Sequence, residues 1–337
     1  MTSSDQNPWA TPKLKKRANP TSEGASISDS ASDSRSAFHK KEKKVLDLTP
    51  DPLTASLPAH LELWQNSIGW QPTAEQQALF QQFYAQILVG NRQLNLTRIT
   101  DPDEFWEKHL WDSLSGLAPW LAEYPLAEDP EDEAQTEAAT TAMESEAEEE
   151  EEGPIRVIDI GTGAGFPGIP AAIALSATLP IELTLLDSTR KKVQFLQLVC
   201  QQLQLKANCI AERAETLGKN KAHREQYDLA LIRAVGPVTT CAEYAMPFLK
   251  VGGQLVLFRG QWSTTDTETL LPVIDRLGGE ITDLQSWQTP LTQSVRHCIF
   301  IHKDAPTPAG FPRAVGVPAK KPLTHPCGFS QSGRGAC

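Results

Sequence analysis

Short apolar runs alternate with amphipathic segments between residues 155 and 303. The runs 155–160, 182–186 and 207–211 have the length and composition of buried strands. The same patterns predict further strands at 228–232, 253–258, 280–286 and 295–302, and helices at about 166–176, 189–204 and 239–249. This alternation predicts an α/β fold with a mostly parallel sheet covered on both faces, in which ligands bind beyond the carboxyl ends of the strands.

Apolar residues at helical spacing dominate residues 59–124, ahead of the α/β pattern. Thr73, followed three residues later by Gln76, is typical of a capping box at a helix start. Asp101-Pro102 predicts the start of another helix, with Glu104 placed to reach back to the cap. We therefore expect a small N-terminal helical unit that covers part of the α/β domain.

Three segments show no hydrophobic period. Residues 1–58 are rich in Ser, Pro, Lys and Asp, and bury too little apolar surface to offset the entropy of ordering, so we expect a disordered tail. Residues 125–153 contain thirteen Asp or Glu and no Lys or Arg, which predicts a disordered acidic insertion because like charges repel. Residues 304–337 form a basic, Pro-rich tail, which leaves 154–303 as the α/β domain.

The net charge of −11 argues at first against a nucleic-acid partner, because phosphates repel an acidic surface. The insertion alone accounts for −13, so the rest of the chain carries +2, and the part from residue 154 onward carries +5. Once the insertion is set aside, the charge no longer opposes an RNA substrate.

The composition also predicts a cytoplasmic protein without membrane or metal. No stretch approaches 18 consecutive apolar residues, and the first 17 residues lack the apolar core of a secretory signal. The six cysteines are scattered without a C-x-x-C pair, which excludes a standard structural zinc site and suits a reducing compartment.

A glycine-rich segment, Gly161-Thr-Gly-Ala-Gly-Phe-Pro-Gly168, occupies the first strand-to-helix turn. The dinucleotide fingerprint G-x-G-x-x-G requires glycine where Phe166 stands, so a nicotinamide cofactor is disfavoured. The form G-x-G-x-G followed by Asp187 at the end of the next strand is usual in class I methyltransferases, which bind S-adenosylmethionine (SAM). We expect the Asp187 carboxylate to accept hydrogen bonds from the ribose hydroxyls.

The wider sequence around this turn resembles the RsmG (GidB) family of bacterial 16S rRNA guanine-N7 methyltransferases, over about residues 59–323. The matching segments are Asn95-Leu-Thr97, Lys108-His-Leu-Trp-Asp-Ser-Leu114, Asp159 to Pro170, Asp187-Ser188, Arg190-Lys-Lys192, Arg213-Ala-Glu215, Arg233-Ala-Val235, Pro312-Arg313, Gly316, Pro318 and Lys320-Lys-Pro-Leu323. The resemblance implies the class I fold, a Rossmann-like, mostly parallel seven-stranded sheet, and methyl transfer to N7 of guanine 527 in the small-subunit rRNA. It assigns SAM contacts to Gly161, Phe166, Ala214, Glu215 and Arg233.

Guanine N7 carries a free lone pair, so the reaction needs no dedicated general base, and we assign none. His109, Asp112 and Asn95 are candidates to shape the guanine pocket, although a hydrogen bond between helix and domain would explain the first two equally well. For Arg233 the alternative to a cofactor contact is an ion pair with Asp228 or Glu215. The cations expected to contact rRNA phosphates are Arg190, Lys191, Lys192, Arg313, Lys320 and Lys321.

Three other functions stay open from the sequence. The chain could methylate another substrate, could bind SAM on the ribosome without turnover, or could be an oxidoreductase, which Phe166 disfavours. The expected partner is 16S rRNA or the small subunit, and the expected state is a monomer.

Overall fold

The computed structural model describes residues 46, 48–49, 54–125 and 153–324. All described residues belong to one unit, Val45–Cys337. Most of the predicted N-terminal tail, the acidic insertion apart from its end residues, and residues 325–337 lie outside the described residues.

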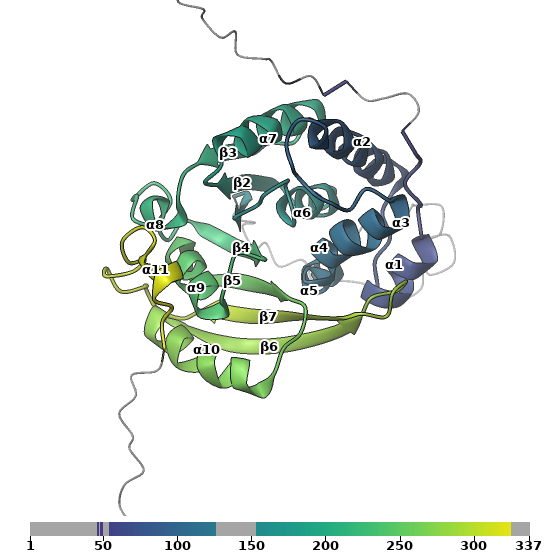
Figure 1. The fold of residues 1–337 in the computed structure, drawn as a ribbon. Helices are drawn as coiled ribbons and strands as arrows, with labels where there is room; N and C mark the ends of the chain where they lie inside the picture. Colours follow the sequence, from purple (N-terminus) through teal and green to yellow (C-terminus); the bar gives the residue numbers. More distant parts are fainter. Residues whose placement is uncertain (1–45, 47, 50–53, 126–152, 325–337) are drawn as a thin grey trace, which may run out of the picture. The chain divides into compact units, whose positions relative to one another are not determined.

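Seven strands form one sheet in the order β3-β2-β1-β4-β5-β7-β6 (Figure 1). Their bounds are β1 Ile155–Ile160, β2 Ile181–Asp187, β3 Ala207–Ala211, β4 Tyr227–Arg233, β5 Leu249–Arg259, β6 Gly279–Gln288 and β7 Val295–Lys303. The first five in this order pair in parallel, and β7 lies antiparallel between β5 and β6. The predicted seven-stranded, mostly parallel sheet is confirmed.

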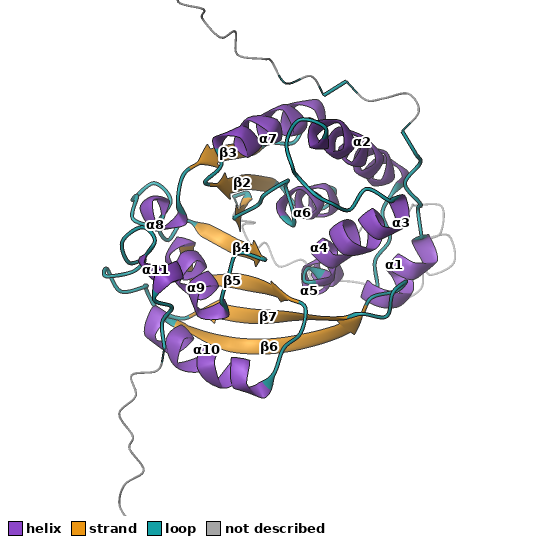
Figure 2. Cartoon of the chain, viewed as in Figure 1, coloured by secondary structure: helices purple, strands orange, loops and turns teal. Residues whose placement is uncertain are grey.

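Helices cover both faces of the sheet (Figure 2). Successive strand residues face opposite sides, so Val157 lies in one core cluster and its neighbour Ile158 in the other. One face packs against α6 (Gly168–Leu175) and α7 (Arg190–Gln202). The other face packs against α8 (Ala214–Leu217), α9 (Val238–Ala245), a 3₁₀ turn at Met246–Phe248, and α10 (Thr264–Leu277).

The N-terminal helices share the first of these cores with the sheet. They are α1 Leu61–Ile68, α2 Ala74–Asn91, α3 Pro102–Phe105, a π-helical segment Trp106–Trp111 labelled η1, α4 Asp112–Ser115 and α5 Ala118–Glu123. The capping box of Thr73 and Gln76 is confirmed, since both reciprocal hydrogen bonds form. The prediction for Glu104 is wrong: Asp101 caps its N–H, but its own carboxylate pairs with Lys108, one helical turn away.

Residues 304–324 fold back onto α9 and end in α11 (Val317–Lys320). Arg313 donates four hydrogen bonds to the buried Glu243 carboxylate from three of its nitrogens, and Thr240 donates to the carbonyl of Pro318. Phe311 and Leu323 are buried in the second core. This stretch of the predicted tail is therefore an ordered strap beside the carboxyl edge of the sheet.

Candidate functional site

A pocket of about 240 Å³ opens where β1, β2, β3 and β4 end. The turns after these strands supply most of its wall, and α9 and the strap supply the rest. The lining residues are Ile160, Gly161, Leu186, Asp187, Ser188, Glu212, Arg213, Ala214, Glu215, Val235, Tyr244 and Ala319. We call it the β1–β2 pocket; four of the predicted cofactor residues line it, namely Gly161, Asp187, Ala214 and Glu215.

The turn after β1 requires glycine at its first position. Gly161 has φ +74°, and a Cβ on it would lie 2.6 Å from Cγ2 of Val235. A side chain there would strain the backbone and collide with the wall of the β1–β2 pocket. The backbone at Gly161 is therefore directly accessible to a molecule in that pocket.

The Asp187 carboxylate fixes the turns on both sides of the β1–β2 pocket. Gly163 N–H donates to Asp187 Oδ2 (3.1 Å) and Thr189 N–H donates to Oδ1 (2.7 Å). A carboxylate accepts about four hydrogen bonds, so Asp187 retains capacity for a ligand hydroxyl. Its position agrees with the expected ribose contact, which stays a prediction.

Asp159, near the end of β1, is buried beneath the glycine turn. Its Oδ2 accepts from Gly168 N–H (2.8 Å), whereas no donor among the described residues reaches Oδ1. Burial raises the pKa of Asp159 to about 6. A buried carboxylate oxygen without a partner is costly, and it suits a ligand that brings a donor or a positive charge.

Glu215 lines the β1–β2 pocket and also holds the strap. Its Oε1 accepts from Arg213 Nη2 (3.1 Å), the Tyr244 hydroxyl (3.3 Å) and Gly316 N–H (2.9 Å). Burial raises the pKa of Glu215, but these donors outweigh burial, so its pKa is lower than usual. The strap is therefore fastened to the pocket wall, where Ala319 completes the lining.

Three of the other predicted site residues, Phe166, His109 and Arg233, lie together outside the lining of the β1–β2 pocket. Phe166 is buried and stacks face to face on His109, with ring centroids 4.3 Å apart and planes inclined by 9°. The guanidinium of Arg233 lies 5.5 Å from the centre of the same ring. His109 Nε2 is hydrogen-bonded to the Thr97 hydroxyl (2.8 Å). Burial, followed by the charges of Arg233 and Lys108, lowers the pKa of His109 to about 3, so its imidazole is neutral at pH 7.

Arg233 forms its ion pair with Asp112, not with Asp228 or Glu215 as the alternative prediction had it. Arg233 Nη1 lies 2.7 Å from Asp112 Oδ2, and Arg296 Nε lies 3.0 Å from Oδ1 of the same carboxylate. The end of β4 faces the helical segment that carries Asp112, whereas Asp228 pairs with Lys250 and Glu215 with Arg213. We call Arg233, Asp112 and Arg296 the arginine bridge.

The predicted RNA-contacting cations are not equivalent. Arg190 and Lys191 are exposed, Lys192 is half-buried with its Nζ near Gly163, and Lys320 and Lys321 are exposed on the strap. Arg313 instead pairs with Glu243 and also donates to the Lys321 carbonyl. Its guanidinium holds the strap, so we place no RNA contact on it.

Asn95 lies apart from the arginine bridge, on the exposed loop between α2 and α3. This loop lines a separate surface pocket of about 580 Å³. Its neighbour Thr97 is the residue that reaches His109.

Sequence reasoning missed Tyr244, Val235, Asp159 and Arg296 as site residues. Asp159 and Val235 stood inside recognised motifs and could have been considered. Tyr244 sits within a helix and Arg296 within a strand, where no local pattern distinguishes them from structural residues.

No helix among the described residues is long and apolar enough to cross a membrane. The described part of the chain also holds no group of three or more His, Cys, Asp or Glu side chains arranged to bind a metal ion.

Comparison with known proteins identifies the family. The profile of GidB, described as rRNA small subunit methyltransferase G, matches residues 76–123 and 138–293. Ribosomal RNA small subunit methyltransferase G of Nostoc sp. strain PCC 7120 is 48% identical over 272 residues, covering 80% of this chain and 100% of that protein. Its counterpart in Trichormus variabilis is 50% identical over 276 residues, with the same two coverages.

One solved structure that matches the chain is only distantly similar. The 1,6-didemethyltoxoflavin-N1-methyltransferase of Burkholderia thailandensis, with bound S-adenosylhomocysteine, is 15% identical with a TM-score of 0.35, covering 45% of this chain and 72% of that one. This likeness is too distant to bear on function. The profile match and the sequence relatives show that the chain belongs to the rRNA small subunit methyltransferase G (GidB) family.

Proposed function

We propose that this protein transfers a methyl group from SAM to N7 of a guanine in 16S rRNA, guanine 527 by the family resemblance. The observation that carries the proposal is family membership along the full length of the relatives, together with a pocket at the expected edge of the sheet. The named relatives are small-subunit rRNA methyltransferases, and the guanine and its N7 atom are the finer part of the proposal. We also propose that the protein is cytoplasmic and monomeric.

The residues of the β1–β2 pocket fit SAM. The glycine turn gives close backbone access, and Asp187 retains acceptor capacity for ribose hydroxyls. The unpartnered Oδ1 of Asp159 suits the ammonium group of a methionine moiety. When bound there, SAM supplies an electrophilic methyl group on a positively charged sulfur. Arg233 is the proposed partner of the methionine carboxylate, in exchange for part of its contact with Asp112.

The ionisable groups near the site favour N7 over a nucleophile that must first lose a proton. His109, with a pKa of about 3, is a weak base and is hydrogen-bonded to Thr97. Asp112 is held by two arginines. Guanine N7 attacks with an existing lone pair, so the contribution of the protein is to hold base and methyl group in line; such positioning supplies roughly 7–11 kcal/mol.

The exposed cations Arg190, Lys191, Lys320 and Lys321, together with the half-buried Lys192, are the proposed phosphate contacts. They lie at the start of α7 and on the strap, both of which border the β1–β2 pocket or its glycine turn. A guanine within folded rRNA must be turned out of its stack to reach such a pocket.

The decisive experiment maps N7-methylguanine in 16S rRNA from a strain that lacks this gene. The modification at one guanine should be absent and should return with the wild-type gene. The Gly161→Asp variant should not restore it, because its side chain would collide with Val235 in the β1–β2 pocket. A complete modification pattern in the deletion strain would overturn the proposed function.

A further inference from the structure

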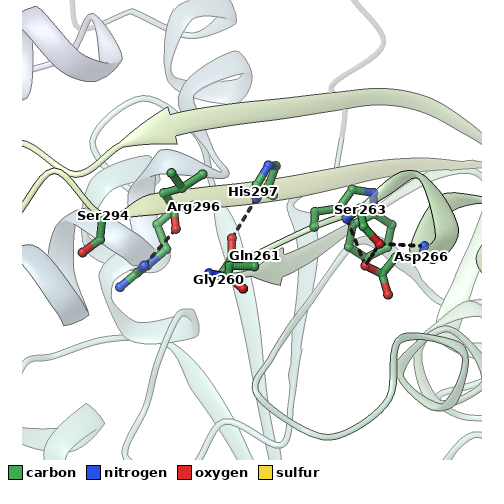
Figure 3. A pocket seen from close by; sticks show the side chains of 9 residues that line it. Gly260, Gln261, Ser263, Asp266, Ser294, Arg296 and His297 are labelled. Atoms are coloured by element: carbon green, nitrogen blue, oxygen red, sulfur yellow. Dashed lines mark hydrogen bonds between the residues drawn. The ribbon is translucent and has the colours of Figure 1, made fainter.

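A second pocket opens at the same edge of the sheet as the β1–β2 pocket, beyond β4. Residues 260–263, which follow β5, face residues 294–297, which begin β7, across a space of about 760 Å³ (Figure 3). This β5–β7 pocket shares no lining residue with the β1–β2 pocket. Its volume lies within the range of ordinary ligand sites.

The wall of the β5–β7 pocket combines a cation, aromatic rings and hydrogen-bonding groups. Arg296 extends from β7 along one side, and the His297 ring is fixed by the carbonyl of Gly260, 2.7 Å from Nδ1. Trp262 is half-buried: it packs against the second core, and its Nε1 donates to the Thr267 hydroxyl (2.8 Å). Bases stack on aromatic rings and phosphates pair with guanidinium groups, so this wall has the chemistry that single-stranded RNA requires.

The lining also contains one acidic residue, Asp266, whose carboxylate is engaged in hydrogen bonds within the protein. Asp266 Oδ2 accepts from the N–H of Ser263 (2.9 Å) and from its hydroxyl (2.6 Å), which caps α10. The carboxylate is thus already solvated by the protein. Arg296 is the cation of this lining, and its Nε pairs with Asp112, so a phosphate in the pocket would share the guanidinium with that carboxylate.

The arginine bridge connects the β5–β7 pocket to the centre of the molecule. Arg296, in the pocket wall, and Arg233, at the end of β4, hold the two oxygens of the Asp112 carboxylate. Arg233 in turn lies over Phe166. A nucleotide in the β5–β7 pocket would therefore touch Arg296. Through Asp112, Arg296 is linked to Arg233, the proposed partner of the methionine carboxylate.

We infer that the β5–β7 pocket is an RNA subsite, which holds a nucleotide of the rRNA strand next to the reacting guanine, with Arg296 on its phosphate and Trp262 against its base. This inference rests on the proposed function and adds the path of the substrate strand. The strand crosses the carboxyl edge of the sheet from β7 towards β4. The cofactor stays in the β1–β2 pocket.

The test places opposite charges at Gln261, an exposed residue of the pocket lining. In the full-length protein, Gln261→Glu should weaken binding of unmethylated small ribosomal subunits about threefold or more, and Gln261→Lys should tighten it. The lysine variant should also steepen the logarithmic salt dependence of binding by about 0.7–0.9, the effect of one added phosphate contact. The dissociation constant for S-adenosylhomocysteine, measured by calorimetry, should not change in either variant.

The matched control is the same pair of changes at Gln201, which is exposed near the end of α7, at the opposite edge of the sheet. Gln201→Glu and Gln201→Lys should leave subunit binding close to wild type. The inference is overturned if the two positions respond alike, or if affinity for S-adenosylhomocysteine falls together with subunit binding. Failure of the proposed function would instead appear in the wild type, as no methyl transfer to the subunits.

Discussion

Asp112 holds one negative charge between two guanidinium groups, and its side chain is 14% exposed. Asp112→Asn preserves the shape but leaves Arg233 and Arg296 facing each other without a counter-charge. We expect the free energy of unfolding to fall by about 1.5–3 kcal/mol, the size of hydrogen bonds to charged groups. Chemical denaturation measures this loss.

The matched control for Asp112→Asn is Asp103→Asn, because Asp103 pairs with His60 at a site where the carboxylate is 64% exposed. That change should cost less than about 1 kcal/mol, as exposed pairs do. Equal losses at the two positions would show that the arginine bridge contributes no more than a surface pair.

His109 should make stability depend on pH. Its pKa is about 3 in the folded protein, against about 6.5 in an unfolded chain. The unfolded chain therefore binds an additional proton between these values, so the folded state loses stability as the pH falls from 6.5 towards 3. The loss is at most about 1.4 kcal/mol per pH unit.

Denaturation of wild type and His109→Gln between pH 7 and 4 tests this dependence. The stability of the wild type relative to the variant should decrease as the pH falls, because the variant has no imidazole to protonate. A pH-independent difference for His109→Gln would contradict the prediction.

At the scale of elements, an ion pair with a buried carboxylate is one of the contacts that hold the strap. Arg313 donates to the fully buried Glu243 carboxylate through its backbone N–H, Nε and Nη2. Arg313→Ala would leave that carboxylate without its counter-charge and should cost about 3–5 kcal/mol, the usual result of breaking a buried pair from one side. Affinity for S-adenosylhomocysteine should fall as well, because the strap carries Ala319 to the β1–β2 pocket.

Replacing the two exposed lysines of the strap tests RNA binding without disturbing the fold. The double variant Lys320→Ala, Lys321→Ala should unfold within about 0.5 kcal/mol of wild type, since surface changes cost little. Its affinity for small subunits should decrease, with a flatter salt dependence. An unchanged salt slope, measured by filter binding, would remove these lysines from the RNA interface.

Elements were predictable from sequence where their signals are local. The cap at Thr73 and the alternation of strands and helices depend on residues within a few positions of one another. The arginine bridge joins residues 121 and 184 positions apart, and no spacing rule encodes such a pair. The helix α10 was not predicted: Ser263 and Asp266 form its capping box, but Pro272 in its interior resembles a helix breaker.

At the scale of the whole molecule, the proposed cofactor pocket and the proposed RNA subsite share one edge of the sheet. The β1–β2 pocket lies where β1, β2, β3 and β4 end, and the β5–β7 pocket lies where β5 ends and β7 begins. Arg296 reaches this edge because β7 is antiparallel to β5. The first residues of β7 therefore lie beside the last residues of β5. The direction of β7 thus decides that Arg296 lies at the same edge as the β1–β2 pocket.

The acidic insertion should act on the same rRNA through charge. Deleting residues 126–152 removes thirteen negative charges and changes the net charge from −11 to +2. We expect the deletion variant to associate faster with small subunits at low salt, because long-range repulsion decreases. The gain should fade near 0.15 M salt, where the screening length is about 8 Å. Stopped-flow association at several salt concentrations tests this, with affinity for S-adenosylhomocysteine as the control for an intact fold. An association rate equal to wild type at every salt concentration would show that the insertion does not compete with RNA.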